Sequence, residues 1–395
     1  MDKPAEQESK ITRFRRDRRL VVIGLLRSLA MLAMLGTLVF GVLRYHDSFS
    51  AENVRRLYQY VKASASQTEA FSEYGLERGF RIIYTPFESG VALVEEDTYH
   101  FISGYSGSGF SHQLKYQSPA LEAGDASLLI YDRGGTGYCV ANSYSIKGKR
   151  STESEIISGC MNRRGDFALV TNEQGYRAGV TVFDSRLRQQ CKWQTSKYYV
   201  MLAAVSPNGS RFAALCLYEA DGAAQSDVLG FRIGEEEPSL RIPLGSRSVY
   251  SMKYSGGGEL VVICDDGTYI YDEEGKRVGE YLYSDLVMFF HRGGEMPLLA
   301  LRRSGNDQTR ICLLGEDGAP VFEKAYSGSL RAMARGEDGF ALLFGKRLVI
   351  ADPREESETE LAVSEVRDVI ASGGGYLAVY SDRMERVQTE EGNEE

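Results

Sequence analysis

Histidine, proline and tryptophan are scarce in this chain of 395 residues, with four, nine and one copies respectively. Basic charge is also in deficit over most of the chain, because residues 45–395 hold 37 Lys/Arg against 51 Asp/Glu. This balance argues against a nucleic-acid partner, since neutralising phosphates needs a basic face. Forty-two glycines beside nine prolines favour many tight turns and an all-β fold.

Only one long hydrophobic run is present, at residues 20–43, and Arg27 is its single charge. As a helix of 24 residues it would span about 36 Å, enough to cross a membrane core of about 30 Å. We expect Arg27 to reach back to the interface, because it lies near the basic end of the run. A cleavable signal peptide ending near Ser48–Ser50 is the alternative, although its apolar core would normally be shorter.

Charge on the two sides of this run predicts its orientation. Six basic residues precede it closely, namely Lys10, Arg13, Arg15, Arg16, Arg18 and Arg19, whereas Arg44 follows it nearly alone. The positive-inside rule then puts the N-terminus in the cytoplasm and the rest outside it, at the cell membrane. The lipid bilayer is thus one expected partner, and the basic tail could also touch anionic headgroups.

The expected organisation has five parts. A basic cytoplasmic tail (1–19) precedes a transmembrane helix (20–43) and a juxtamembrane amphipathic helix with its stem (44–66). The helix is indicated by apolar residues at i, i+3, i+4 and i+7, namely Val54, Leu57, Tyr58 and Val61. The large domain (67–388) and an acidic tail (389–395) follow.

The large domain repeats one pattern, in which a glycine-containing turn precedes a short apolar run. Eight such runs begin at residues 91, 127, 167, 212, 260, 297, 340 and 376. Their mean spacing is about 41 residues, close to one four-stranded propeller blade. The fifth unit shows four strands clearly, at 249–254, 260–264, 268–271 and 278–283.

Continuously apolar second strands favour a β-propeller over a sandwich, because such strands are buried on both faces. The eighth unit offers only three strands, at 366–370, 376–380 and 384–387. The missing fourth strand could come from residues 69–74, which would close the ring by joining the two ends of the domain. We therefore predict a single all-β propeller of eight blades, with seven as the alternative.

This layout resembles the membrane-anchored β-propeller proteins of Gram-positive bacteria that form a domain-of-unknown-function family, and more distantly quinoprotein-dehydrogenase-like and WD40-like propellers. The one short motif is Ser206-Pro207-Asn208-Gly209, which is similar to the Ser-Pro-Asp-Gly turn of many propellers. The resemblance implies a fold and a location, not a reaction.

Recognisable catalytic and cofactor motifs are missing. Quinone-binding propellers carry a tryptophan motif in most blades, whereas this chain has only Trp193. The loop at residues 103–109 lacks the spacing of a phosphate cradle, and Asp265-Asp266 before a glycine is typical of a hairpin. His100 and His112 lie on neighbouring strands, but two ligands do not make a zinc site. No catalytic, cofactor-binding or metal-binding residue is assigned, no cofactor is expected, and the ligand-binding residues are unknown.

Six cysteines invite a disulfide interpretation outside the cytoplasm, but their positions in the repeat argue against it. Cys216 and Cys264 are expected to end the second strands of successive units, too far apart to bond. Cys160 and Cys191 fall on the first and last strands of one blade. The other two are Cys139 and Cys312, and we expect all six to be free thiols that pack as small apolar groups.

The main functional hypothesis is a membrane-tethered binding or scaffold module outside the cytoplasm, without catalysis. Its partner would be an envelope protein, a peptide or a glycan. An extracytoplasmic oxidoreductase or hydrolase with a site in the channel is the first alternative, since acids from several blades could converge there. A structural subunit of a membrane complex is the second.

Overall fold

The structure is a computed structural model that describes residues 27–36, 72–77, 82–104, 109–291, 297–303, 305, 307–336 and 339–388. The chain divides into two units, Met1–Arg56 and Leu57–Glu395. In the first unit residues 27–36 are helical, and in the parts of the chain that the structure describes no helix is long and apolar enough to cross a membrane. The rest of the expected span and the expected helix at 54–61 lie outside the described residues.

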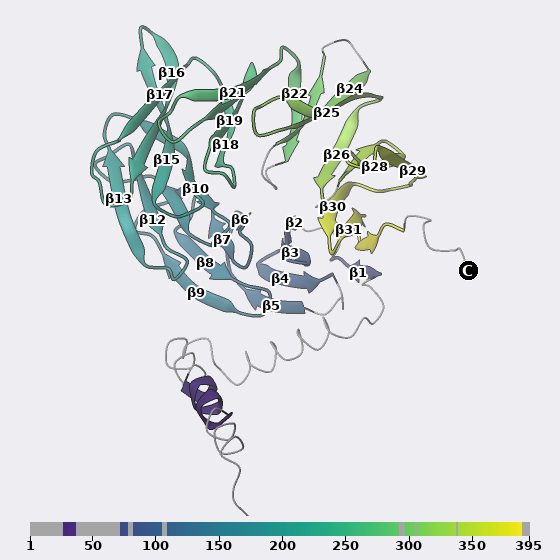
Figure 1. The fold of residues 1–395 in the computed structure, drawn as a ribbon, viewed down its shortest axis with the longest axis horizontal. Helices are drawn as coiled ribbons and strands as arrows, with labels where there is room; N and C mark the ends of the chain where they lie inside the picture. Colours follow the sequence, from purple (N-terminus) through teal and green to yellow (C-terminus); the bar gives the residue numbers. More distant parts are fainter. Residues whose placement is uncertain are drawn as a thin grey trace, which may run out of the picture. The chain divides into compact units, whose positions relative to one another are not determined.

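The second unit is a propeller of eight four-stranded antiparallel blades (Figure 1). The first, innermost strands are β2 (Ile82–Phe87), β6 (Pro119–Ala123), β10 (Ile156–Met161), β14 (Tyr199–Val205), β18 (Val249–Tyr254), β22 (Leu286–His291), β26 (Leu330–Arg335) and β30 (Asp368–Ser372). The second strands are β3 (Gly90–Glu95), β7 (Leu128–Asp132), β11 (Phe167–Thr171), β15 (Arg211–Ala220), β19 (Leu260–Cys264), β23 (Leu298–Arg302), β27 (Phe340–Phe344) and β31 (Gly375–Val379).

The third strands are β4 (Thr98–Ser103), β8 (Gly137–Ala141), β12 (Ala178–Phe183), β16 (Ala223–Arg232), β20 (Gly267–Tyr271), β24 (Gln308–Leu314), β28 (Arg347–Asp352) and β32 (Arg383–Arg386). The outer strands of the first seven blades are β5 (Gly109–Gln113), β9 (Ile146–Ser151), β13 (Gln189–Thr195), β17 (Leu240–Gly245), β21 (Arg277–Leu282), β25 (Pro320–Ser327) and β29 (Ser357–Ala362). The eighth blade takes β1 (Glu73–Gly75) as its outer strand.

Every one of the eight apolar runs forms the second strand of a blade, which confirms the repeat. These strands are buried along nearly their whole length, as in β3, β7 and β11, because each lies between two neighbouring blades. The outer strand β29, in contrast, is almost entirely exposed. The core is therefore a set of apolar clusters between adjacent blades, one for each of the eight interfaces.

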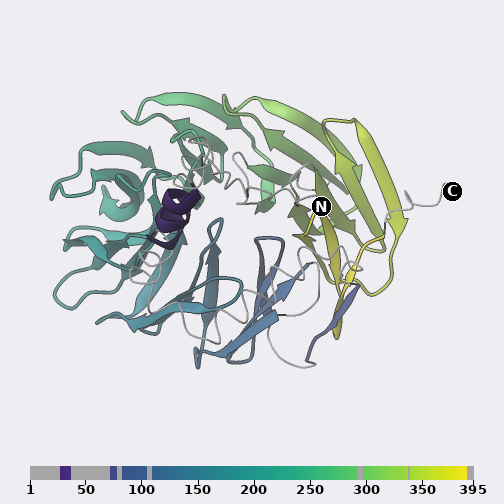
Figure 2. The same ribbon diagram turned by 60° about the horizontal axis from the view of Figure 1, so that its bottom comes forward.

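The ring closes by the predicted route, but the closing strand β1 spans Glu73–Gly75 instead of residues 69–74. Strand β1 pairs antiparallel with β32, so that Tyr74 lies opposite Met384. Figure 2 shows this purple-blue N-terminal strand beside the yellow C-terminal strands. Residues 69–71 of the expected closing strand lie outside the described residues. Beneath β1, an apolar cluster containing Leu76, Leu93 and Met384 joins the last blade to the first.

The fourth blade departs from the expected pattern. Cys216 does not end the second strand, because β15 continues to Ala220 and returns as the equally long β16. Asp221 and Gly222 form the tight turn between them, both with positive φ (54° and 75°). This longer hairpin accounts for the wide spacing between the fourth and fifth apolar runs.

The strand directions give the ring two faces. The hairpin face carries the turns between first and second strands and between third and fourth strands. The crossover face carries the turns between second and third strands and the connections to the next blade. The chain enters β1 at Ser72 and leaves β32 towards Gln388, and both points are on the hairpin face.

Candidate functional site

A cavity of about 270 Å³ opens at the hairpin face, at one mouth of the central channel. We call it the channel cavity. It is built by the innermost strands of blades two to five, β6, β10, β14 and β18, and by the turns that follow them. Four consecutive blades thus contribute side chains that lie far apart in the sequence.

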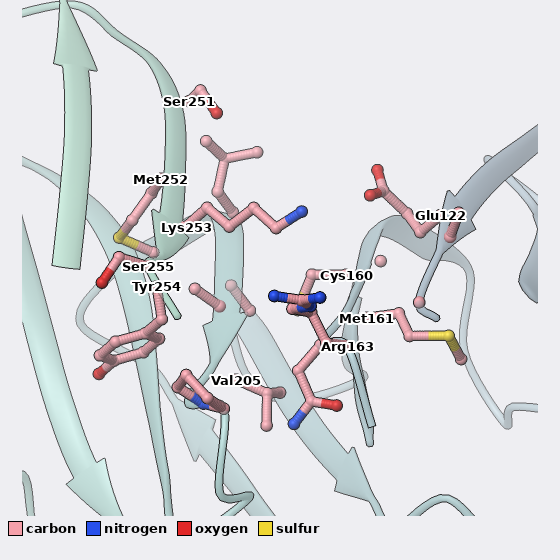
Figure 3. Close-up of a pocket in the computed structure, with 18 of the residues that line it drawn as sticks. Glu122, Cys160, Met161, Arg163, Val205, Ser251, Met252, Lys253, Tyr254 and Ser255 are labelled. Atoms are coloured by element: carbon pink, nitrogen blue, oxygen red, sulfur yellow. The ribbon is translucent and has the colours of Figure 1, made fainter. Parts of the chain in front are cut away.

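Equivalent positions of these strands line the channel cavity. The penultimate residues of the four strands are Glu122, Cys160, Ala204 and Lys253, and all four are lining residues. In Figure 3, Glu122 and Lys253 point into the cavity from opposite sides, and the Arg163 guanidinium also reaches into it. Glu122 and Lys253 both act on the Cys160 thiol. Burial raises the pKa of this thiol to about 12, Glu122 adds to the increase, and Lys253 opposes it.

The rim of the channel cavity is held by contacts between blades. The Asp125 backbone N–H donates to the Arg163 carbonyl (2.9 Å), and the two side chains form an ion pair at 3.1 Å. The Asn162 amide donates to the Ser206 carbonyl (2.8 Å), which joins the third blade to the fourth. In a neighbouring pocket, Arg211 pairs with Glu273 (2.8 Å) and joins the fourth blade to the fifth.

The turn with the Ser-Pro-Asn-Gly motif belongs to this rim. Asn208 Oδ1 accepts hydrogen bonds from the backbone and hydroxyl of Ser210 (3.0 and 2.7 Å), which fixes the turn. Gly209 has φ of +70°, and a Cβ there would meet Asp166 Oδ2 at 2.5 Å. Only glycine fits this position, so the motif has a structural role beside the cavity.

The walls of the channel cavity are mixed in character. Buried Met161, Met252 and Val205 supply apolar surface, and Tyr254 adds a phenol whose pKa burial raises to about 12. Charged side chains of both signs also line the cavity. Such a site suits a ligand that combines charged groups with an apolar part.

The histidines weighed in the sequence lie away from the channel cavity. His112 pairs with Tyr99 and His100 with Ser111, so the two histidines lie on opposite faces of the first blade. Among the described residues no group of three or more potential metal ligands occurs. His46, the side chain of His291 and residues 105–108 of the serine-glycine loop lie outside the described residues.

Asp265 and Asp266 form a hairpin on the crossover face, away from the channel cavity. Asp266 pairs with Arg247 at 2.8 Å, and Asp265 accepts a hydrogen bond from the Ser248 backbone (3.1 Å). Trp193 packs on Phe231 of the next blade, with ring centroids 4.7 Å apart. All six cysteines are free, as expected.

Sequence reasoning missed the channel cavity, although a signal was present. Glu122 and Lys253 are the charged residues of the inner strands β6 and β18, and they stand at equivalent positions of the repeat. Aligning the eight units on their innermost strands would have exposed these two charges. It would not have shown that they meet, because their blades are separated by two others.

Solved structures of other propellers resemble this ring at low sequence identity. BamB from Moraxella catarrhalis aligns with a TM-score of 0.52 and 10% identity, covering 81% of this chain and 99% of that one. The C-terminal WD40 domain of Sif2 aligns with a TM-score of 0.55 and 11% identity, covering 81% of this chain and 98% of that one. The dihydro-heme d1 dehydrogenase NirN gives 0.52 and 11%, covering 75% of each chain. These likenesses show the fold alone.

No curated protein matches the chain. A family of unknown function, DUF5711, matches residues 60–389, which include the whole described ring up to Gln388. The chain therefore belongs to the DUF5711 family.

Proposed function

We propose that the protein is a non-catalytic binding module that holds a polypeptide segment of an envelope protein in the channel cavity. The observation that carries this proposal is the cavity itself. Its rim is fixed by a hydrogen bond and an ion pair across the second, third and fourth blades, an ion pair in the neighbouring pocket joins the fourth blade to the fifth, and charges of both signs project into the cavity. A rigid, preorganised site loses little entropy on binding, which favours recognition.

A peptide suits the channel cavity better than a glycan. Glycan sites present mainly hydrogen-bonding groups and aromatic platforms to hydroxyl-rich rings, whereas this cavity combines apolar walls with Glu122 and Lys253. A peptide can supply a base for Glu122, an acid for Lys253 and an apolar side chain for Met161 and Met252. We expect the bound segment to carry charges of both signs around an apolar residue.

The location outside the cytoplasm is part of the same proposal. Its support is the apolar run at 20–43 with six basic residues before it. Within the described helix at 27–36, Leu29, Leu32 and Met34 are exposed, as lipid-facing residues would be. The proposed topology is a single pass with the N-terminus in the cytoplasm.

Glycan hydrolysis is an enzymatic alternative whose catalytic residues can be compared with those that line the cavity. Such a reaction commonly uses two carboxylates on either side of the scissile bond. Glu122 and Asp125 both line the channel cavity, but Asp125 is ion-paired with Arg163 at 3.1 Å. This pairing supports binding over hydrolysis.

The test is crosslinking of the full-length protein in its native cells, with identification of the attached polypeptide. Three chains are compared: the wild type, Lys253→Met and the control Lys324→Met. Lys324 lies on the outer strand β25 and pairs with Glu358 at 2.7 Å, so the control loses one positive charge, as Lys253→Met does, at a site remote from the cavity.

We expect Lys253→Met to reduce the main polypeptide adduct at least tenfold, while Lys324→Met leaves it unchanged. Equal adduct yields in all three chains would refute a role for the channel cavity. An adduct found only with glycan or lipid would refute the polypeptide ligand.

A further inference from the structure

Five consecutive inner strands carry a β-bulge at the same place. The pairing register shifts between residues 156 and 158, 200 and 202, 249 and 251, 287 and 289, and 330 and 332. Each bulge adds one residue near the start of the strand, and these residues are Ile157, Met201, Tyr250, Met288 and Arg331. We call this set the bulge collar. The inner strands β2, β6 and β30 pair without such a shift.

Two of the bulges leave an apolar side chain, Met201 or Tyr250, exposed near the start of an innermost strand, whereas Ile157 packs against the apolar cluster between the third and fourth blades. A bulge leaves its extra residue out of the ladder and re-aims the side chain. Met201 is 44% exposed although its neighbour Val200 is only 1% exposed, and Tyr250 is 36% exposed beside Met252 at 6%. On an innermost strand, exposed side chains face the channel or its mouth. The bulge collar therefore lies at the crossover face, where these strands begin.

The Met201 bulge is held in place by the neighbouring blade. The Ser158 hydroxyl, on β10, donates a hydrogen bond to the Met201 carbonyl oxygen (2.7 Å). Ser158 is itself the residue after the bulge of its own strand. The bulges of the third and fourth blades are thus linked, which fixes this part of the bulge collar.

Exposed apolar residues of the described ring gather on the same face. Six of its eight large exposed hydrophobic side chains lie on the crossover face, and they are Tyr176, Tyr199, Met201, Tyr250, Leu282 and Leu286. The other two, Val278 and Val321, lie on the outer strands β21 and β25. An apolar surface concentrated on one face marks an interaction site.

We propose that the bulge collar docks an apolar segment of a partner polypeptide, at a site separate from the channel cavity. The innermost strands pair on one side only within the described sheets, so their channel edges present backbone groups that a peptide can use. Methionine adapts its shape to varied apolar side chains, and tyrosine adds rigid contact area. Arg331 closes the arc with a positive charge, so the segment is expected to carry an acidic residue at one end.

Both ends of the described ring lie on the face opposite the bulge collar. The described ring is entered at Ser72 and left near Gln388, both on the hairpin face. The edges of the innermost strands that are unpaired within the described sheets favour a polypeptide over a lipid as the occupant, because lipid tails offer no hydrogen-bond partners to backbone groups.

The test places a photoreactive benzoylphenylalanine at residue 201 or 250 of the full-length protein in its native cells. Residues 278 and 321 are the matched control positions, because Val278 and Val321 are similarly exposed but lie on outer strands. We expect residues 201 and 250 to label one apolar segment of the same polypeptide, identified by mass spectrometry. Labelling at 278 and 321 should be at least tenfold weaker.

A second substitution in each labelled chain tests whether the bulge collar is responsible for the labelling. Met201→Lys should abolish labelling from residue 250, whereas Val321→Lys and Lys253→Met should leave it unchanged. The last comparison separates this site from the channel cavity. Equal labelling from all four positions, lipid adducts, adducts between copies of this chain or no polypeptide adduct at 201 and 250 would each overturn the proposal.

Discussion

At the scale of single residues, the thiols show how burial controls chemistry in this ring. Desolvation by burial raises the pKa of Cys139, Cys216 and Cys264 to about 12, and that of Cys312 to about 11. The thiolate is the reactive form of cysteine. At pH 8 a thiol with a pKa of about 12 is ionised in roughly one molecule in 10⁴. These cysteines therefore act as small apolar side chains between blades.

The first prediction concerns these thiols. Denatured protein kept from air should react with about six equivalents of a thiol reagent, because all six cysteines are free. The native protein at pH 8 should react far more slowly, and the rate should rise with pH as the thiolate fraction grows. A denatured count near zero before reduction would show that the cysteines are paired.

At the scale of single elements, the short strand β1 has an effect larger than its length suggests. It covers the last blade and adds Leu76 to the apolar cluster that joins this blade to the first. The ladder includes the hydrogen bonds from Arg386 N–H to Ser72 O (2.9 Å) and from Leu76 N–H to Asp382 O (2.7 Å). Antiparallel bonding alternates along the strand, so the Tyr74 N–H faces β32 and the Glu73 N–H faces away.

The second prediction uses this alternation. Tyr74→Pro should lower the free energy of unfolding by about 1–3 kcal/mol beyond the effect of Tyr74→Ala, because it removes a donor from the closing ladder. Glu73→Pro is the matched control and should cost much less. The measurement is the unfolding midpoint of each full-length chain in denaturant. Equal midpoints for Tyr74→Pro and Glu73→Pro would show that β1 does not close the ring.

At the scale of the whole molecule, the ring separates two candidate binding surfaces. The channel cavity opens on the hairpin face, which also carries both ends of the described ring. The bulge collar lies at the opposite, crossover face. Apolar clusters at all eight blade interfaces keep the two faces in a constant arrangement. Under the two proposals above, the ring would hold one partner on each face.

The third prediction concerns topology across the membrane. If residues 20–43 form a span with the basic tail inside, a protease added to intact cells should remove the ring and spare residues 1–19. Antibodies against a tag at each end would follow the two parts. Permeabilised cells are the control, in which the tail should also be cleaved. Loss of the tail alone from intact cells would contradict this orientation.

Much of the fold could be predicted from the sequence because the propeller repeats one local pattern. Second strands are buried on both faces, so each reads as a continuous apolar run, and all eight runs proved to be such strands. The four strands of the fifth unit were located within one residue, since turn residues bound each of them. Even the closing strand was anticipated, because the eighth unit lacked a fourth strand of its own.

The two candidate binding surfaces, in contrast, were decided by the tertiary structure. Glu122 and Lys253 are visible in the sequence, but only closure of the ring brings residues from the second and fifth blades to one cavity. The bulge at Met201 depends on the pairing register between β14 and β15, which no local pattern encodes. Local periodicity determines which residues form strands. Which side chains face one another across the ring depends on how blades that are distant in the sequence are placed around its axis.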